Sequence, residues 1–70
     1  MKLTNAVEGK EYIIKSVNTY DSEMDAFLFS LGCYSGEPIK VIKHLKGGMI
    51  IMVKNARYNI DKQLADTIDI

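Results

Sequence analysis

The sequence contains two side chains that could bind a transition metal, the thiol of Cys33 and the imidazole of His44. Thiolate is a soft ligand and a redox-active group, and imidazole is the most common nitrogen ligand of metals. Each occurs once, so one chain cannot supply a two-histidine or two-cysteine site. A lone cysteine is more often a small buried apolar group, and Lys43 and Lys46 near His44 disfavour a cation there. We therefore expect no metal and no cofactor in the monomer, with Cys33 and His44 as weak candidates.

Carboxylates could act in pairs as a general acid and a general base. Asp21, Glu23 and Asp25 lie close together, but at the start of an expected helix, where negative charge stabilises the helix dipole. Asp61 is explained in the same way as a helix cap. The sequence has no CxxC, HExxH or GxxxxGK[ST] motif, so zinc-finger, zincin and P-loop chemistry have no support. We predict that the protein is not an enzyme.

Length and charge limit the remaining classes of protein. Seventy residues form one small domain, which buries about 60% of its unfolded surface and has little stability to spare. Nine basic and nine acidic residues balance to zero, which argues against a nucleic-acid partner and a basic membrane-surface protein. The 47% apolar content excludes a disordered chain, and no apolar run reaches the ~18 residues of a membrane span.

One cysteine excludes a disulfide framework and favours the reducing cytoplasm. We expect one cytoplasmic domain, residues 1–70, without direct membrane insertion.

The clearest element that could position these residues is a helix from Ser22 to Leu31. Its apolar residues recur at i, i+3, i+4 and i+7, which places them on one face; they are Met24, Phe27, Leu28 and Leu31. Gly32 follows directly and can adopt the left-handed conformation that ends helices. We expect Met24, Leu28 and Leu31 to be buried.

The other segments have the pattern of short strands joined by tight turns. Strands are expected at 12–17, 39–45, 49–54, 57–60 and 67–70. The first of them should have a bulge or bend before Val17. A turn is expected at 55–56 and a helical turn at 62–66. Gly47 and Gly48 form a two-residue hairpin signal, because glycine accepts the positive φ angles of such turns. This order predicts a mainly β, partly open barrel.

Residues 28–41 carry a recognisable motif. They read LFSLGCYSGEPIKV, which resembles the L-x-x-L-G-(two residues)-P-G-x-x-hydrophobic-x-V signature of the FeoA family. Residues 55–60 are similar to the family's G-S-R-hydrophobic-A-L strand, and residues 65–70 to its closing A-x-x-I-x-V. Ser35 departs from the pattern, because many members have proline there. The order and spacing of these pieces make the chain resemble a FeoA domain along nearly its whole length.

The resemblance implies a fold and a function. The fold would be a five-stranded SH3-like barrel, with the helix inserted between strands 1 and 2 and a short helical turn before the last strand. The function would be that of a cytoplasmic accessory protein of ferrous iron uptake that binds the cytoplasmic part of a FeoB-type permease. Fe²⁺ would be the ion transported by the partner. The alternative is a metal-linked regulatory domain, because the same module forms the C-terminal domain of iron- and manganese-dependent repressors.

Two regions compete as contact surfaces. The first is the loop after the helix with the exposed helix side, and we assign it to the permease; its candidates are Phe29, Cys33, Tyr34 and Ser35. The second follows from the alternation of side chains along strands. If residues 49, 51 and 53 point inward, an apolar patch faces outward, and we assign it to weak homo-oligomer formation; its candidates are Ile42, Ile50 and Met52.

Overall fold

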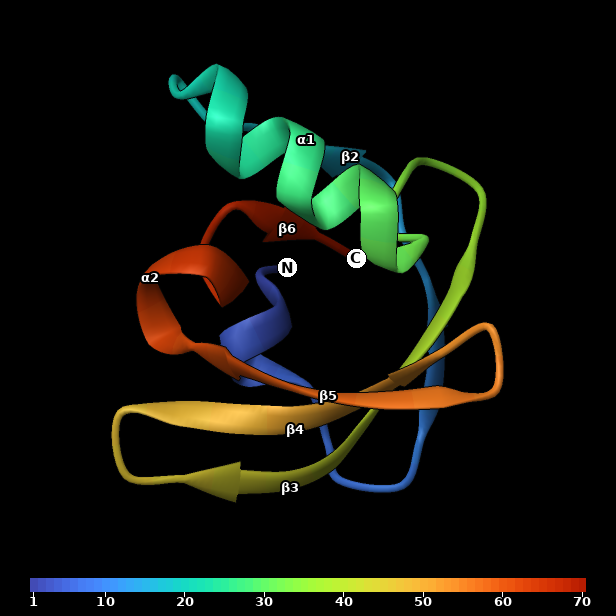
Figure 1. The fold of residues 1–70 in the computed structure, drawn as a ribbon. Coiled ribbons are helices and arrows are strands. Elements are labelled where there is room, and N and C mark those ends of the chain that lie inside the picture. The colour runs from blue at the N-terminus through green and yellow to red at the C-terminus, as the bar shows by residue number, and fades with distance from the viewer.

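The computed structural model describes residues 1–70 as two sheets, a helix that crosses one end and a short second helix (Figure 1). The elements in chain order are the 3₁₀ turn η1 (Leu3–Asn5), β1 (Glu11–Ile13), β2 (Ser16–Val17), α1 (Ser22–Leu31), β3 (Pro38–Leu45), β4 (Gly48–Val53), β5 (Ala56–Asp61), α2 (Lys62–Ala65) and β6 (Ile68–Asp69). Figure 1 shows α1 at the top of the molecule and β3, β4 and β5 at the bottom.

The strands form two separate antiparallel sheets. One has four strands in the order β1-β3-β4-β5, and the other pairs β2 with β6. The five-stranded barrel expected from the resemblance is therefore not present, because the sheets do not close on each other. The expected first strand divides at Ile14, whose N–H donates to the Glu37 carbonyl and whose carbonyl accepts from Gly36. The chain leaves the first sheet there and enters the second at Ser16, so α1 follows the second strand and not the first.

The bounds of α1 agree with the expected helix. Asp21 caps its start by accepting hydrogen bonds from the N–H groups of Glu23 and Met24, at 2.9 and 3.4 Å. Gly32 ends it with a φ of 100°. Burial differs from the expectation, because only Leu28 is fully buried, whereas Met24 and Leu31 are partly exposed. Figure 1 shows that α1 begins away from the sheets and approaches them at its end.

The core lies between the two sheets. Alternation along β4 is as expected, with Met49, Ile51 and Val53 pointing inward. The other buried apolar residues are Leu3, Ala6, Ile14, Leu28, Cys33, Ile39, Val41, Ile60, Ala65, Ile68 and Ile70. No polar or charged residue is fully buried, so apolar burial supplies the main stabilisation.

The two glycines of the β3–β4 hairpin have different roles. Gly47 has a φ of 81°, as the hairpin signal predicts. Gly48 is the first residue of β4 and has no positive φ; a Cβ there would lie 2.5 Å from the carbonyl oxygen of Ile60. The next turn lies one residue earlier than expected, because Lys54 and Asn55 have the positive φ angles of 50° and 63°.

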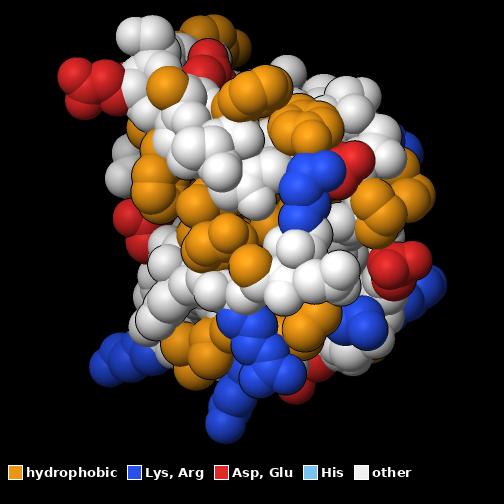
Figure 2. Space-filling view, turned by 45° about the vertical axis from the view of Figure 1, so that its right-hand side comes forward, with side chains coloured by type: hydrophobic (Ala, Val, Ile, Leu, Met, Phe, Trp, Pro, Cys, Tyr) orange, Lys and Arg blue, Asp and Glu red, His pale blue; other side chains and the backbone are white.

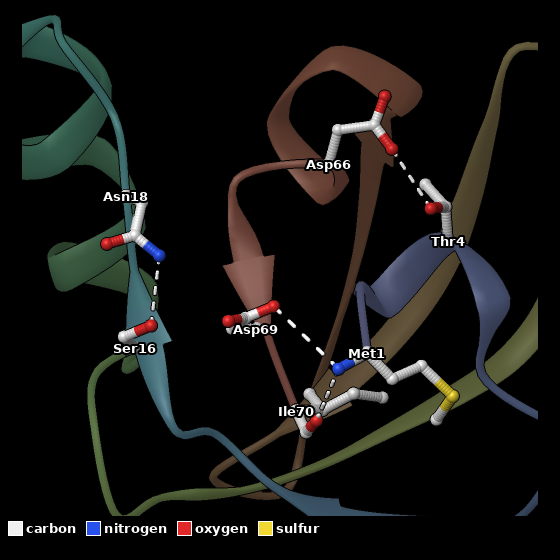
Figure 3. A network of polar contacts seen from close by, with 7 residues as sticks. All are labelled: Met1, Thr4, Ser16, Asn18, Asp66, Asp69 and Ile70. Carbon is white, nitrogen blue, oxygen red and sulfur yellow. Dashed lines mark hydrogen bonds and ion pairs between the residues drawn. The ribbon is translucent and has the colours of Figure 1, made fainter.

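The two chain ends lie side by side (Figure 3). The Met1 ammonium group donates to the Ile70 carbonyl at 3.2 Å and lies 3.9 Å from the Asp69 carboxylate. Nearby, the Thr4 hydroxyl donates to Asp66 at 2.9 Å, and this hydrogen bond lowers the pKa of Asp66. These contacts hold the first residues of the chain next to β6, and η1 next to the end of α2.

Candidate functional site

Four side chains from three segments meet at the end of α1; we call them the aromatic–lysine cluster, and they are Phe29, Tyr34, Glu37 and Lys54. The rings of Phe29 and Tyr34 are 5.1 Å apart and inclined by 37°. The Lys54 ammonium lies 5.2 Å from the centre of the Tyr34 ring and 2.6 Å from the Glu37 carboxylate. Phe29 is 67% exposed, so the cluster presents an aromatic surface next to a charge pair.

The local sequence explains how this cluster is held. Gly32 ends α1 and lets the Lys54 chain pass directly over it, because a Cβ at Gly32 would lie 2.8 Å from Lys54 Cδ. Lys54 itself comes from the β4–β5 turn. Its hydrogen bond to Glu37, and then its interaction with Tyr34, raise the pKa of Lys54. The ammonium group is therefore a permanent cation, placed over an aromatic ring in a cation–π contact.

Two of the four residues predicted for the partner surface, Phe29 and Tyr34, belong to the cluster. A third, Ser35, follows Tyr34 directly in the chain. Phe29 and Ser35 are exposed and Tyr34 is partly exposed. Cys33 points elsewhere, because it is 2% exposed and belongs to the core. Its side chain is therefore not part of this surface, and burial raises the pKa of Cys33 to about 11. The sequence did not indicate Glu37 and Lys54, which reach the cluster through the fold.

The buried thiol leads to a measurable expectation. At pH 8, iodoacetamide should alkylate native Cys33 at least ~100-fold more slowly than the urea-unfolded protein, because thiolate is the reactive species and access is blocked. The raised pKa also means that the folded state loses stability from about pH 8.5, where an exposed thiol ionises, up to about pH 11. Equal alkylation rates in the folded and unfolded protein would place the thiol at the surface.

His44 lies on β3, and its ring is engaged by the backbone. Its Nε2 atom is 2.7 Å from the carbonyl oxygen of Ala6, and its backbone N–H donates to the Glu8 carboxylate at 2.7 Å. No three His, Cys, Asp or Glu side chains lie close enough together to hold a metal ion. Cys33 and His44 are thus in separate environments, one in the core and one beside the N-terminal segment.

The predicted self-association patch lies on the outer side of the four-stranded sheet. Ile42, Ile50 and Met52 are all partly exposed, and a bulge in β3 falls between Val41 and Lys43, at Ile42. The pairing register adds a feature that the sequence did not indicate: Met52 lies between Lys40 and Arg57, and Ile50 lies between Lys43 and Asn59. Figure 2 shows Lys and Arg side chains gathered at this lower end of the molecule. We call Lys40, Lys43, Ile50, Met52 and Arg57 the outer sheet face.

A second surface that the sequence did not indicate runs between α1, α2 and the β3–β4 hairpin. Two adjoining hollows of about 330 and 380 Å³ share Phe27, Asp61 and Leu64 in their walls. Met24 adds to the apolar floor of this surface, and Asp21 and Glu23 add carboxylates at its α1 end. We call this surface the α1–α2 groove. Met24 and Phe27 belong to the apolar stripe of α1, and of these two we expected Met24 to be buried.

No helix is long and apolar enough to cross a membrane. The arrangement as a whole has surfaces that suit binding: an exposed aromatic pair, a basic sheet face and an acidic groove. Short antiparallel strands in a partly open arrangement define a small all-β architecture. The chain is therefore a small, mainly β domain whose loops and sheet faces can contact a partner.

Comparison with known families identifies the family to which this domain belongs. The family model of the FeoA domain matches residues 1–70, and the chain belongs to the FeoA domain family. This is a non-catalytic accessory family linked to ferrous iron transport. No curated protein sequence matches the chain.

Solved structures show the same fold. A crystal structure of an iron uptake regulatory protein, FeoA, is 26% identical, covers 97% of this chain and 91% of its own, and has a TM-score of 0.87. The Stenotrophomonas maltophilia FeoA complexed with zinc is described as a procaryotic SH3 domain protein; it is 16% identical, with coverages of 99% and 87% and a TM-score of 0.85.

The fold also occurs within a larger type of protein. A manganese-dependent transcriptional repressor is 16% identical with a TM-score of 0.88 over 97% of this chain. The chain spans 39% of that repressor's length. At this identity the likeness shows the fold alone.

Proposed function

We propose that this protein is a non-enzymatic regulator of ferrous iron uptake that binds the cytoplasmic part of a FeoB-type permease. Family membership over residues 1–70 supports the transport system. The observation that carries the binding site is the exposed Phe29 ring, held against Tyr34 beside the Lys54–Glu37 pair. Aromatic side chains with a polar rim are the usual centre of a protein–protein contact.

The mechanism is binding that changes the permease's conformational populations. A partner that covers Phe29 and Tyr34 removes apolar surface from water, and the Lys54–Glu37 pair gives the contact a fixed orientation. A regulator shifts an equilibrium only by binding one state of the permease more tightly than the other. In this proposal Fe²⁺ is the permease's cargo, and the regulator holds no metal of its own.

Substitutions in the cluster test the site. Phe29→Asp and Tyr34→Asp should each weaken binding to the immobilised cytoplasmic domain of the cognate permease by at least about tenfold, which corresponds to about 1.4 kcal/mol. The reason is that each change removes aromatic area and places a charge in the contact. Surface plasmon resonance measures the dissociation constant.

Tyr20→Asp is the matched control for these variants. Tyr20 is a fully exposed aromatic residue that precedes α1 and lies outside the cluster, so this change should leave the dissociation constant unchanged. Wild-type affinity in Phe29→Asp and Tyr34→Asp, together with weakened binding in Ile50→Asp, would move the permease contact to the outer sheet face. No permease binding by the wild-type protein would reject the proposed function.

A further inference from the structure

Two surfaces of this molecule have matching chemistry and opposite charge. On the outer sheet face, Ile50 and Met52 form an apolar centre between basic side chains. In the α1–α2 groove, an apolar floor lies beside carboxylates, with Lys46 at the hairpin end. Figure 2 shows basic side chains gathered at the lower end, while acidic side chains lie at the upper left and also along the right-hand side. The two surfaces named here therefore differ in the sign of their charges.

The charges on both surfaces form no ion pairs within the molecule. The ion pairs of the chain are Met1–Asp69, Glu37–Lys54 and Lys62–Asp66. None of them includes a basic residue of the outer sheet face or a carboxylate of the groove. Glu11 lies across from Lys40 in the sheet register but forms no ion pair with it. The basic side chains of the outer sheet face and the Glu23 carboxylate are therefore free to interact with another molecule, whereas Asp21 and Asp61 also accept hydrogen bonds from backbone N–H groups as helix caps.

The sign of the charges decides how two copies can meet. Pairing one outer sheet face with the same face of another copy would bring Lys40, Lys43 and Arg57 against their own equivalents, and like charges in contact are unfavourable. Pairing the sheet face of one copy with the groove of the next joins opposite charges around two apolar centres. Such a contact uses two different patches and is heterologous.

We propose that the protein associates with itself head to tail, with the outer sheet face of one copy in the α1–α2 groove of the next. Ile50 and Met52 then cover the groove floor at Phe27 and Leu64, and Lys43 and Arg57 face the groove carboxylates. The contact is small and weak. Salt opposes it, because exposed charges are screened over ~10 Å at 0.1 M ionic strength.

Two variants with altered surface charge test the geometry. The sheet variant carries Lys43→Glu and Arg57→Glu, and the groove variant carries Glu23→Lys and Gln63→Lys; all four positions are exposed. Asp21 and Asp61 are left unchanged because they cap the two helices. Sedimentation velocity at up to about 1 mM protein and low salt should show a wild-type mass above the 7.9 kDa monomer that falls as salt is added.

Each variant alone should be monomeric, and an equimolar mixture should associate again, since each then meets a surface of opposite charge. A control variant, Lys10→Glu with Lys15→Glu, has the same net charge as the sheet variant but keeps the outer sheet face intact. In an equimolar mixture with the groove variant it should associate less than the sheet variant does. Circular dichroism confirms that all variants are folded.

The contrary outcomes are distinct. A groove variant that still associates, with a monomeric sheet variant, would mean face-to-face pairing and would overturn the proposal. A wild-type protein that stays monomeric also overturns it, and if that protein binds a polyglutamate peptide, the outer sheet face belongs to an acidic partner. None of these measurements includes the permease, so their result is independent of the proposed function.

Discussion

Replacing Leu28 with alanine is expected to lower the free energy of unfolding by about 2–5 kcal/mol. Leu28 is the residue of α1 that is completely buried, so its removal leaves a cavity where the helix packs on the core. A domain of this size has a total stability of only about 4–10 kcal/mol, at ~0.05–0.15 kcal/mol per residue. Urea denaturation followed by circular dichroism measures the change.

Phe29→Ala is the matched control for this prediction. It removes more atoms from the neighbouring position of the same helix, but the ring is 67% exposed. The loss should stay below about 1 kcal/mol, the value of its aromatic contact with Tyr34. A larger loss for Phe29→Ala than for Leu28→Ala would show that α1 packs on the domain through its other face.

Replacing Gly48 with asparagine is expected to cost at least about 2–3 kcal/mol, in the range of overpacked sites. A Cβ there would lie 2.5 Å from the backbone oxygen of Ile60, and strand pairing fixes that oxygen. The side chain cannot avoid the contact by rotating, because the clash involves the first side-chain atom. Thermal and urea unfolding of the variant measure the effect.

The same substitution at the adjacent position provides the comparison. Gly47 has a φ of 81°, but a Cβ added there would have no other atom within 4 Å, and asparagine tolerates the left-handed region better than most residues. Gly47→Asn should therefore cost less than about 1 kcal/mol. If the two variants are equally unstable, the hairpin depends on conformational freedom at both glycines.

Local spacing explains which elements were predictable. The apolar stripe, the acidic cap and the terminal glycine all lie within residues 21–32, so the bounds of α1 followed from that segment alone. Alternation along β4 assigned Met49, Ile51 and Val53 to the core for the same reason. The family motif lies in the sequence itself, and the FeoA domain assignment over residues 1–70 is confirmed.

The candidate surfaces were predictable only in part. Phe29 and Tyr34 are five residues apart at the end of one helix, so the motif indicated them together. Loop position made Cys33 a candidate for the same surface, but its side chain lies in the core, which is the more common place for a lone cysteine. Lys54 is twenty residues further along the chain, and no local pattern connects it with Tyr34.

The amino-acid sequence by itself determined α1, the inward side of β4 and the family, because each depends on neighbours within one helix, one strand or one motif. The tertiary structure decided which strands pair, and through that the close approach at Gly48 and the basic rim around Ile50 and Met52. Strand register joins residues that are distant in the chain, and side-chain spacing does not encode it. The group of basic side chains on one face of this neutral protein therefore becomes visible only once the strands are paired.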